Sequence, residues 1–258
     1  MRKIDESYSS GITEATRKEF LNFAKWFNTI IGHDPLIVGG WAVYTYVPEG
    51  RGSRDVDVIF PDARVKEVAV NQYLAAHGYK EVRKRLFESS FEKEITTKGG
   101  ERITMEIDAE SAGTQVTDEN TGIKLIWKLA QQHSRHVEIE PGVFIYVPEP
   151  ELLIAYKMGA LIKREKALAI APAQTGYFIP KILKDVHDVV RLFAKEGLDI
   201  DHKKLYGFLA AMKIPPYLPE CAALVHRYAT DADVAGLIVK FDEGYGKLER
   251  VAKGRKIQ

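Results

Sequence analysis

The sequence predicts an α+β fold: a small mixed β-sheet with flanking helices through about residue 148, followed by a helical domain. Apolar and polar residues alternate in two segments before residue 110, as in half-buried strands, and recur every three to four residues in two others, as in amphipathic helices. Pro148 and Pro150 then precede a stretch whose pattern is helical toward the C-terminus. The chain therefore divides into residues 1–148 and 149–258.

The first domain is expected to open with a helix over Thr13–Ile31 that ends near Gly32 and packs on the first strand. A second helix, Asp62–His77, has Asp62 as its N-cap and Gly78 just past its end. The strands and connections expected here are strands at 36–38 and 55–60, one or two strands in 79–97, a turn at 98–100, a strand over 101–109, a loop at 112–122, a strand or short helix at 123–132 and a last strand over 143–147.

The most informative segment is Leu36–Tyr44, in which a short apolar run leads into Gly39-Gly40 and then into residues that can start a helix. This strand-turn-helix layout brings bare backbone N–H groups close to a phosphate. By itself a Gly-Gly pair more often marks a turn. Its position ahead of a carboxylate pair, with Arg51, Gly52, Ser53 and Arg54 leading into that pair, favours a phosphate site.

Asp55 and Asp57 lie on the next predicted strand. Because successive strand side chains point to opposite faces, the two carboxylates share one face, roughly 6–7 Å apart at Cα. Like charges on one face repel, so the pair needs open water or a cation. Mg²⁺ is commonly held by one or two carboxylates that waters and substrate phosphates complete. The sequence therefore predicts a metal site at Asp55 and Asp57, with a solvated strand edge as the alternative.

A third carboxylate is expected from the strand over 101–109. Its alternation puts Glu106 and Asp108 on the face opposite Ile103, Met105 and Ile107. We favour Asp108 as the third metal ligand, with Glu106 second, because the sequence alone does not say which of them lies level with the pair. The alternative is a polar face turned to solvent.

In the second domain, the helix expected from Glu151 to about Lys166 is apolar nearly all round and is therefore predicted to be buried. Lys157 projects between apolar residues of this helix, where a lysine is costly without an anionic partner. A triphosphate is one such partner, and Arg164 falls on the same face and extends the cationic stripe. The alternatives are a lysine that reaches the surface or one that meets a structural carboxylate.

The next helix is expected to start near Pro180 and to run to Lys195. Asp185 borders its apolar face and is expected in the active cleft, whereas Asp188 points away from that face and is expected to be solvated. Three further helices are expected over 198–252, with breaks at Pro215-Pro216, Pro219 and Thr230-Asp231.

Composition limits the class of protein. The 258 residues have 45% hydrophobic and 28% charged content, as in a globular protein of one or two domains. A net charge of +1 gives no general nucleic-acid footprint, although basic groups at 80–85, 163–166 and 247–256 can each touch phosphates. The N-terminus has no signal-peptide pattern and no run approaches the roughly 18 apolar residues of a membrane span, so we expect a cytoplasmic protein. The single cysteine, Cys221, is expected to be a buried thiol.

Together, Val38-Gly39-Gly40 and Ser53-Arg54-Asp55-Val56-Asp57 resemble the signature of the DNA polymerase beta-type nucleotidyltransferase superfamily: an apolar residue, Gly-Gly or Gly-Ser, a spacer, then Asp-x-Asp. The Ser/Thr-x-Asp-x-Asp form looks most like the AbiEii-type branch, which includes toxins of toxin-antitoxin systems. The resemblance is strong over residues 30–110 and weaker to about residue 195.

The resemblance implies an Mg²⁺- or Mn²⁺-dependent transfer of a nucleoside monophosphate from an NTP to a hydroxyl of RNA such as tRNA, of a protein or of a small molecule, with a cognate antitoxin as a further partner. The nucleotide would be held by a set of six residues: Gly39, Gly40, Ser53, Arg54, Lys157 and Arg164. The family's Lys helix and Lys-Asp helix correspond to Lys157 and Lys184-Asp185, with the active cleft between the domains. The chain departs from the family at 167–179, which separates these two elements widely. A non-catalytic nucleotide- or RNA-binding module on the same scaffold is the alternative.

Overall fold

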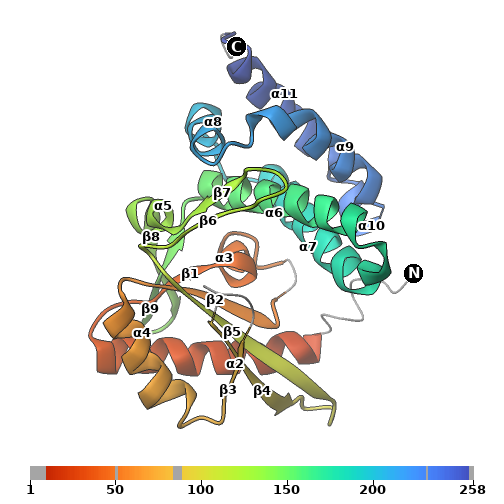
Figure 1. The fold of residues 1–258 in the computed structure, drawn as a ribbon. Helices are drawn as coiled ribbons and strands as arrows, with labels where there is room; N and C mark the ends of the chain where they lie inside the picture. Colours follow the sequence, from red (N-terminus) through yellow and green to blue (C-terminus); the bar gives the residue numbers. More distant parts are fainter. Residues whose placement is uncertain (1–9, 50–51, 84–88, 231, 256–258) are drawn as a thin grey trace. The chain divides into compact units, whose positions relative to one another are not determined.

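The computed structural model describes residues 10–49, 52–83, 89–230 and 232–255 (Figure 1). It has the predicted α+β class, with a mixed sheet and a helical region. The chain forms two compact units, one of residues 1–114 and 126–149 and the other of residues 115–125 and 150–258. In the described ranges, every helix is too short or too polar to cross a bilayer. Arg51 and parts of two predicted basic groups (84–85 and Lys256) lie outside the described residues.

The first unit is built on a mixed sheet whose described strands run in the order β3-β4-β5-β2-β1-β9-β8. The pairs β2–β5 and β1–β9 are parallel and the others are antiparallel. The bounds of these strands are β1 Leu36–Val38, β2 Asp55–Phe60, β3 Lys80–Arg83, β4 Ser89–Thr96, β5 Arg102–Ser111, β8 Ser134–Glu140 and β9 Val143–Pro148.

Four helices accompany this sheet: α2 (Ser10–Trp26), α3 (Gly39–Tyr46), α4 (Ala63–Ala69) and α5 (Trp127–Gln132), where α2 continues as a π-helical turn over Phe27–Ile31 and α4 as one over Val70–Leu74. Aromatic side chains of α2 form the core between the helices. Phe20 stacks on Trp41 of α3 with ring centroids 5.1 Å apart, and Phe23 meets the edge of Tyr73 at 5.3 Å. All four rings are buried.

Most of the predicted elements of the first unit are confirmed. The first helix ends at Gly32, whose φ of +71° continues the chain in the left-handed region that favours glycine. The predicted N-cap of α4 is present, because the Asp62 carboxylate accepts a hydrogen bond from Val65 N at 2.9 Å. The strands at 36–38 and 55–60 have the predicted bounds.

Two segments of the polypeptide differ from the prediction. The predicted loop at 112–122 contains β6 (Gln115–Thr117), which pairs with β7 (Lys124–Ile126). β8 was not predicted, because most of its side chains are polar and none is fully buried, so it lacks the apolar alternation of a half-buried strand. The segment 123–132 is first a strand, β7, and then a helix, α5.

The second unit is helical apart from residues 115–125. Its helices are α6 Pro150–Ile170, α7 Thr175–Ala194, α8 His202–Ala211, α9 Leu218–Tyr228, α10 Ala232–Ala235 and α11 Ile238–Ala252, with 3₁₀ turns at Pro172–Gln174 and Pro215–Tyr217. The first twelve or so residues of α6 are buried, as predicted, and Cys221 is a buried free thiol. Gly159 of α6 lies against Ile123, Ile214 and Met212, and Lys124 N donates to Met212 O at 3.0 Å. These contacts anchor residues 115–125 in the second unit.

The start of α7 was predicted five residues too late. The helix begins at Thr175 and includes Pro180. Pro180 is the sixth residue of this helix, so its missing N–H removes one hydrogen bond, to the carbonyl of residue 176, while its fixed φ still suits the helix. The 3₁₀ turn at Pro172–Gln174 leads directly into the first turn of α7.

Candidate functional site

The four predicted acidic residues of the first unit lie on two neighbouring parallel strands. In the pairing of β2 with β5, Asp55 is level with Glu106 and Asp57 is level with Asp108. Residues at matched positions of a parallel pair point to the same face, and neighbouring strands are about 4.8 Å apart. The register therefore puts both candidates level with the pair, Glu106 beside Asp55 and Asp108 beside Asp57, and the choice of third metal ligand stays a prediction.

Asp108 is held in turn by Ser90, a residue that the sequence analysis missed. Ser90 of β4 is level with Asp108 in the antiparallel pairing of β4 with β5, and its buried Oγ donates a hydrogen bond to Asp108 Oδ1. The signal was present in the sequence, because the predicted turn at 98–100 joins β4 to β5 and fixes which of their residues face each other.

Gly39 makes the closest approach to the acidic residues. Its φ is +69°, and a Cβ built on it would lie 1.7 Å from Asp57 Oδ2. Val38, level with Asp57 across the β1–β2 pair, is the N-cap of α3 and provides no side-chain hydrogen bond to the helix. A helix start that lacks a side-chain cap presents backbone N–H groups suited to an anion. The predicted Gly39-Gly40 turn thus lies directly beside Asp57.

The segment before β2 is tightly held. Ser53 is 1% exposed, and the carbonyl of Arg54 accepts a hydrogen bond from Glu106 N at 3.3 Å. Gly52 packs on α2, since a Cβ there would lie 2.5 Å from Thr13 Cγ2. These contacts fix the path of the chain into Asp55.

The acidic residues suit a metal site that waters and phosphates complete, but not a site formed by protein side chains alone. In the part of the chain that the structure describes, there is no group of three or more His, Cys, Asp or Glu side chains that could hold a metal ion. An all-protein cage is therefore not formed by these residues. Mg²⁺, however, is usually bound by one or two carboxylates and completed by waters and substrate phosphates. The pair Asp55 and Asp57, beside the glycine turn, fits that second arrangement.

The predicted site residues of the second unit form a charge cluster, Lys157, Arg164, Asp185 and Asp188, between α6 and α7. Lys157 Nζ lies 2.7 Å from Asp188 Oδ2 and 3.4 Å from Asp185 Oδ1, and Arg164 Nη1 pairs with Asp185 Oδ2. Burial lowers the pKa of Lys157, but attraction to Asp188 and then to Asp185 outweighs it, so the pKa is raised overall. Two cations and two anions thus neutralise one another inside this unit.

Asp188 is a correction. It was expected in solvent, but it is 5% exposed and is the nearer partner of Lys157. The angular argument assumed that only the apolar face of α7 is covered. In the structure α7 packs against α6, α9 and α11, so both aspartates are buried although they lie outside the apolar face.

The structure therefore divides the predicted site residues into two sets, one in each unit. Gly39, Ser53, Asp55, Asp57, Glu106 and Asp108 belong to the first unit, and Lys157, Arg164 and Asp185 belong to the second. The predicted cleft between the domains stays a prediction.

Comparisons with known proteins add little. No protein-family model matches the chain, and no protein of curated function matches it. Among solved structures, one described as a "putative nucleotidyltransferase" from H. pylori is 16% identical and aligns over 92% of this chain and 97% of its own, with a TM-score of 0.44. A likeness of this size establishes no activity for the chain.

Gly39→Ala should destabilise the first unit more than the matched substitution Gly78→Ala. Both glycines have φ between +69° and +80°, so both variants incur the left-handed strain of about 1–2 kcal/mol. Only at position 39 does the new methyl group meet Asp57, whereas nothing lies within 4 Å at position 78. We expect an excess loss of about 1–3 kcal/mol in urea unfolding. Equal losses for the two variants would contradict the described contact.

Lys157→Met should destabilise the second unit strongly. The substitution leaves two buried carboxylates with Arg164 as the remaining described cation of the cluster, and breaking a buried ion pair costs about 3–5 kcal/mol. The matched control is Lys240→Met, because Lys240 pairs with Glu243 on an exposed surface, where the cost is below about 1 kcal/mol. Urea unfolding measures both. Similar values for the two variants would show that the cluster does not stabilise the fold.

Proposed function

We propose that the chain is a nucleotidyltransferase that transfers a nucleoside monophosphate group from an NTP to an acceptor hydroxyl. One observation carries the proposal: Asp57 lies between the Gly39 turn on one side and Asp108, at the matched register position, on the other. A phosphate-binding turn and a pair of carboxylates are the two components that such a transfer needs. The sequence signature has the same two components, the glycines of Val38-Gly39-Gly40 and the carboxylates of Asp55-Val56-Asp57.

In this proposal the turn holds the nucleotide. Backbone N–H groups at Gly39 and Gly40 donate to phosphate oxygens, as helix starts commonly do. Ser53 is buried, so its role at the phosphates stays a prediction. The close approach of Gly39 to Asp57 keeps this phosphate site within reach of the carboxylates. Arg54, next to Asp55 in the chain, adds a positive charge.

Asp55 and Asp57 would hold Mg²⁺, or Mn²⁺ in its place, with waters and phosphate oxygens as its other ligands, and Glu106 and Asp108 lie beside them at the matched register positions. The bound cation neutralises triphosphate charge and polarises the reacting phosphate. For an acceptor hydroxyl, Asp108 is the base that we favour. Ser90 fixes the orientation of its carboxylate by the hydrogen bond described above.

The acceptor oxygen forms a bond to the α-phosphorus and the bond from that phosphorus to the β-phosphate oxygen breaks. The hydroxyl proton passes to the Asp108 carboxylate, and pyrophosphate leaves with its electron pair.

The roles of Lys157 and Arg164 at the phosphates, and of Asp185 as a residue that orients or deprotonates the acceptor hydroxyl, stay predictions. An incoming phosphate would have to compete with Asp185 and Asp188 for Lys157. These ion pairs favour the alternative already considered for Lys157, a structural carboxylate partner. A cluster in which Lys157 and Arg164 are neutralised by Asp185 and Asp188 is also compatible with a nucleotide-binding module without catalysis. The acceptor, whether RNA, protein or small molecule, is not chosen by the fold.

Asp57→Asn should abolish labelling by NTP. Incubation with each α-labelled NTP, Mg²⁺ and a total cell extract should label one class of molecule and release pyrophosphate. The isosteric amide removes the charge but keeps the shape, and we expect at least about a 10²-fold loss of rate. The matched control is Glu94→Gln, because Glu94 is an exposed carboxylate of β4. Labelling that persists in Asp57→Asn would contradict the catalytic role of Asp57, and NTP binding without pyrophosphate release in the unaltered protein would favour the non-catalytic module.

We also propose, from the resemblance to the AbiEii-type branch, that the activity is toxic to the cell unless an antitoxin is present. Induced expression should then stop growth for the unaltered protein and not for Asp55→Ala, with Glu94→Gln as the control that stays toxic. Colony counts and growth curves measure the effect, and immunoblots confirm equal amounts of protein. Equal toxicity of the unaltered protein and Asp55→Ala would remove the catalytic-toxin role.

A further inference from the structure

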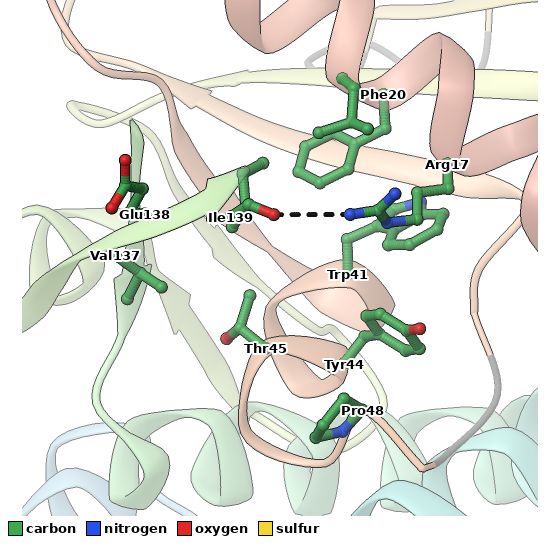
Figure 2. Close-up of a pocket in the computed structure, with 10 residues that line it drawn as sticks. Arg17, Phe20, Trp41, Tyr44, Thr45, Pro48, Val137, Glu138 and Ile139 are labelled. Carbon is green, nitrogen blue, oxygen red and sulfur yellow. Dashed lines mark hydrogen bonds between the residues drawn. The ribbon is translucent and has the colours of Figure 1, made fainter. Parts of the chain in front are cut away.

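The first unit has a cavity between α2, α3 and β8, with a volume of about 470 Å³ (Figure 2). This volume is within the range of about 300–1,000 Å³ that small-molecule sites occupy. None of the acidic residues of the proposed active site lines it. Its lining consists of Arg17, Phe20, Leu21, Trp41, Tyr44, Thr45, Pro48, Val137, Glu138 and Ile139.

The walls of this cavity are largely aromatic. Phe20 and Trp41 stack at 5.1 Å with an interplanar angle of 23°, and Tyr44 meets the edge of Trp41 at 5.5 Å. Arranged rings of this kind are rigid and offer flat apolar surface. Such walls suit a ligand with a planar body.

Two hydrogen-bond donors, the Trp41 Nε1–H and the Arg17 guanidinium, belong to residues that line this cavity. Trp41 is 1% exposed, and its Nε1–H has no hydrogen-bond partner among the described residues. A buried donor left unsatisfied costs about 1–3 kcal/mol, so an acceptor brought by a ligand would recover that energy. The guanidinium of Arg17 makes one long hydrogen bond, from Nη2 to Ile139 O at 3.4 Å. Figure 2 shows this hydrogen bond between Arg17 and Ile139.

The nearby carboxylates are engaged elsewhere. Glu138 accepts a hydrogen bond from Gly142 N at 2.8 Å, and Figure 2 shows its carboxylate well apart from Arg17. Glu140 pairs with Lys25 at 2.8 Å, and this hydrogen bond and, less strongly, the charge of Arg17 lower the pKa of the Glu140 carboxyl. Glu138 keeps its negative charge but lies well apart from Arg17, so the Arg17 guanidinium is the group of this cavity that attracts an anion.

We propose that this cavity binds a small planar organic anion, with its flat body against Trp41 and Tyr44 and its carboxylate or phosphate-ester group on Arg17. The site is distinct from the acidic residues of β2 and β5. The cavity shares helix α3 with the glycine turn, because α3 begins at Gly39 beside Asp57 and carries Trp41, Tyr44 and Thr45. A ligand in the cavity thus contacts the same helix that forms the phosphate turn.

The test uses 2-naphthoate, 2-naphthyl phosphate and the neutral 2-naphthamide as probes, with titration calorimetry of the full chain. The two anions should bind one per chain and at least about tenfold more tightly than the amide, because hydrogen bonds to charged groups contribute about 1.5–3 kcal/mol. The tighter of the two anions identifies the ligand class as a carboxylate or a phosphate ester. Equal affinities for all three probes, or binding of none of them, would overturn the proposal.

Three variants locate the bound probe. Arg17→Met should lower the affinity for the preferred anion about tenfold and bring it level with the amide, whereas Arg102→Met, at an exposed arginine of β5, should leave it unchanged. Asp57→Asn should also leave anion binding unchanged, so this result is independent of the proposed transfer activity. Circular dichroism confirms that each variant is folded. A full preference for the anion in folded Arg17→Met, or its loss in Asp57→Asn, counts against the assigned site.

Discussion

The parallel pairing of β2 with β5 is the constraint on which the rest of the first unit depends. It places four acidic side chains on one face of two neighbouring strands, and like charges so close together repel. The opposite face of the same strands carries buried Val56, Val58, Ile107 and Ala109. Burial of the apolar side chains on one face thus stabilises the pairing of β2 with β5 against the repulsion between the carboxylates on the other face.

The second unit solves the problem of buried charge in a different way. Lys157 and Arg164 of α6 meet Asp185 and Asp188 of α7, and the four charges sum to zero. Buried ion pairs of this kind gain little net free energy over apolar residues, but one member cannot be lost without cost. The cluster therefore fixes how α6 and α7 face each other more than it adds stability.

Much of the first unit could be predicted because local sequence determines it. Alternation gave β2 and the face of Asp55 and Asp57, and capping chemistry gave Asp62 and the end of the first helix at Gly32. The features that were missed depend on contacts between distant segments. β8 is a polar strand at the sheet edge, and the burial of Asp188 depends on which helices surround α7. No local pattern reports either fact. The place of Asp108 beside Asp57 likewise depends on strand register, although the Ser90–Asp108 match follows from the turn that joins their strands.

The segment 115–125 has a bearing on how the polypeptide reaches its final form during synthesis. It leaves the first unit, packs with Ile123 against Gly159 and with Lys124 N on Met212 O, and then returns to form β8 and β9. The ribosome synthesises this segment some forty to ninety residues before its partners Gly159 and Met212, so the segment lacks these contacts while the last strands of the sheet are synthesised. The chain consequently passes between the two units three times. A single cut by a protease at residues 149–150 would leave residues 115–125 attached to the first unit, and a fragment that begins at residue 150 would lack part of its own interior.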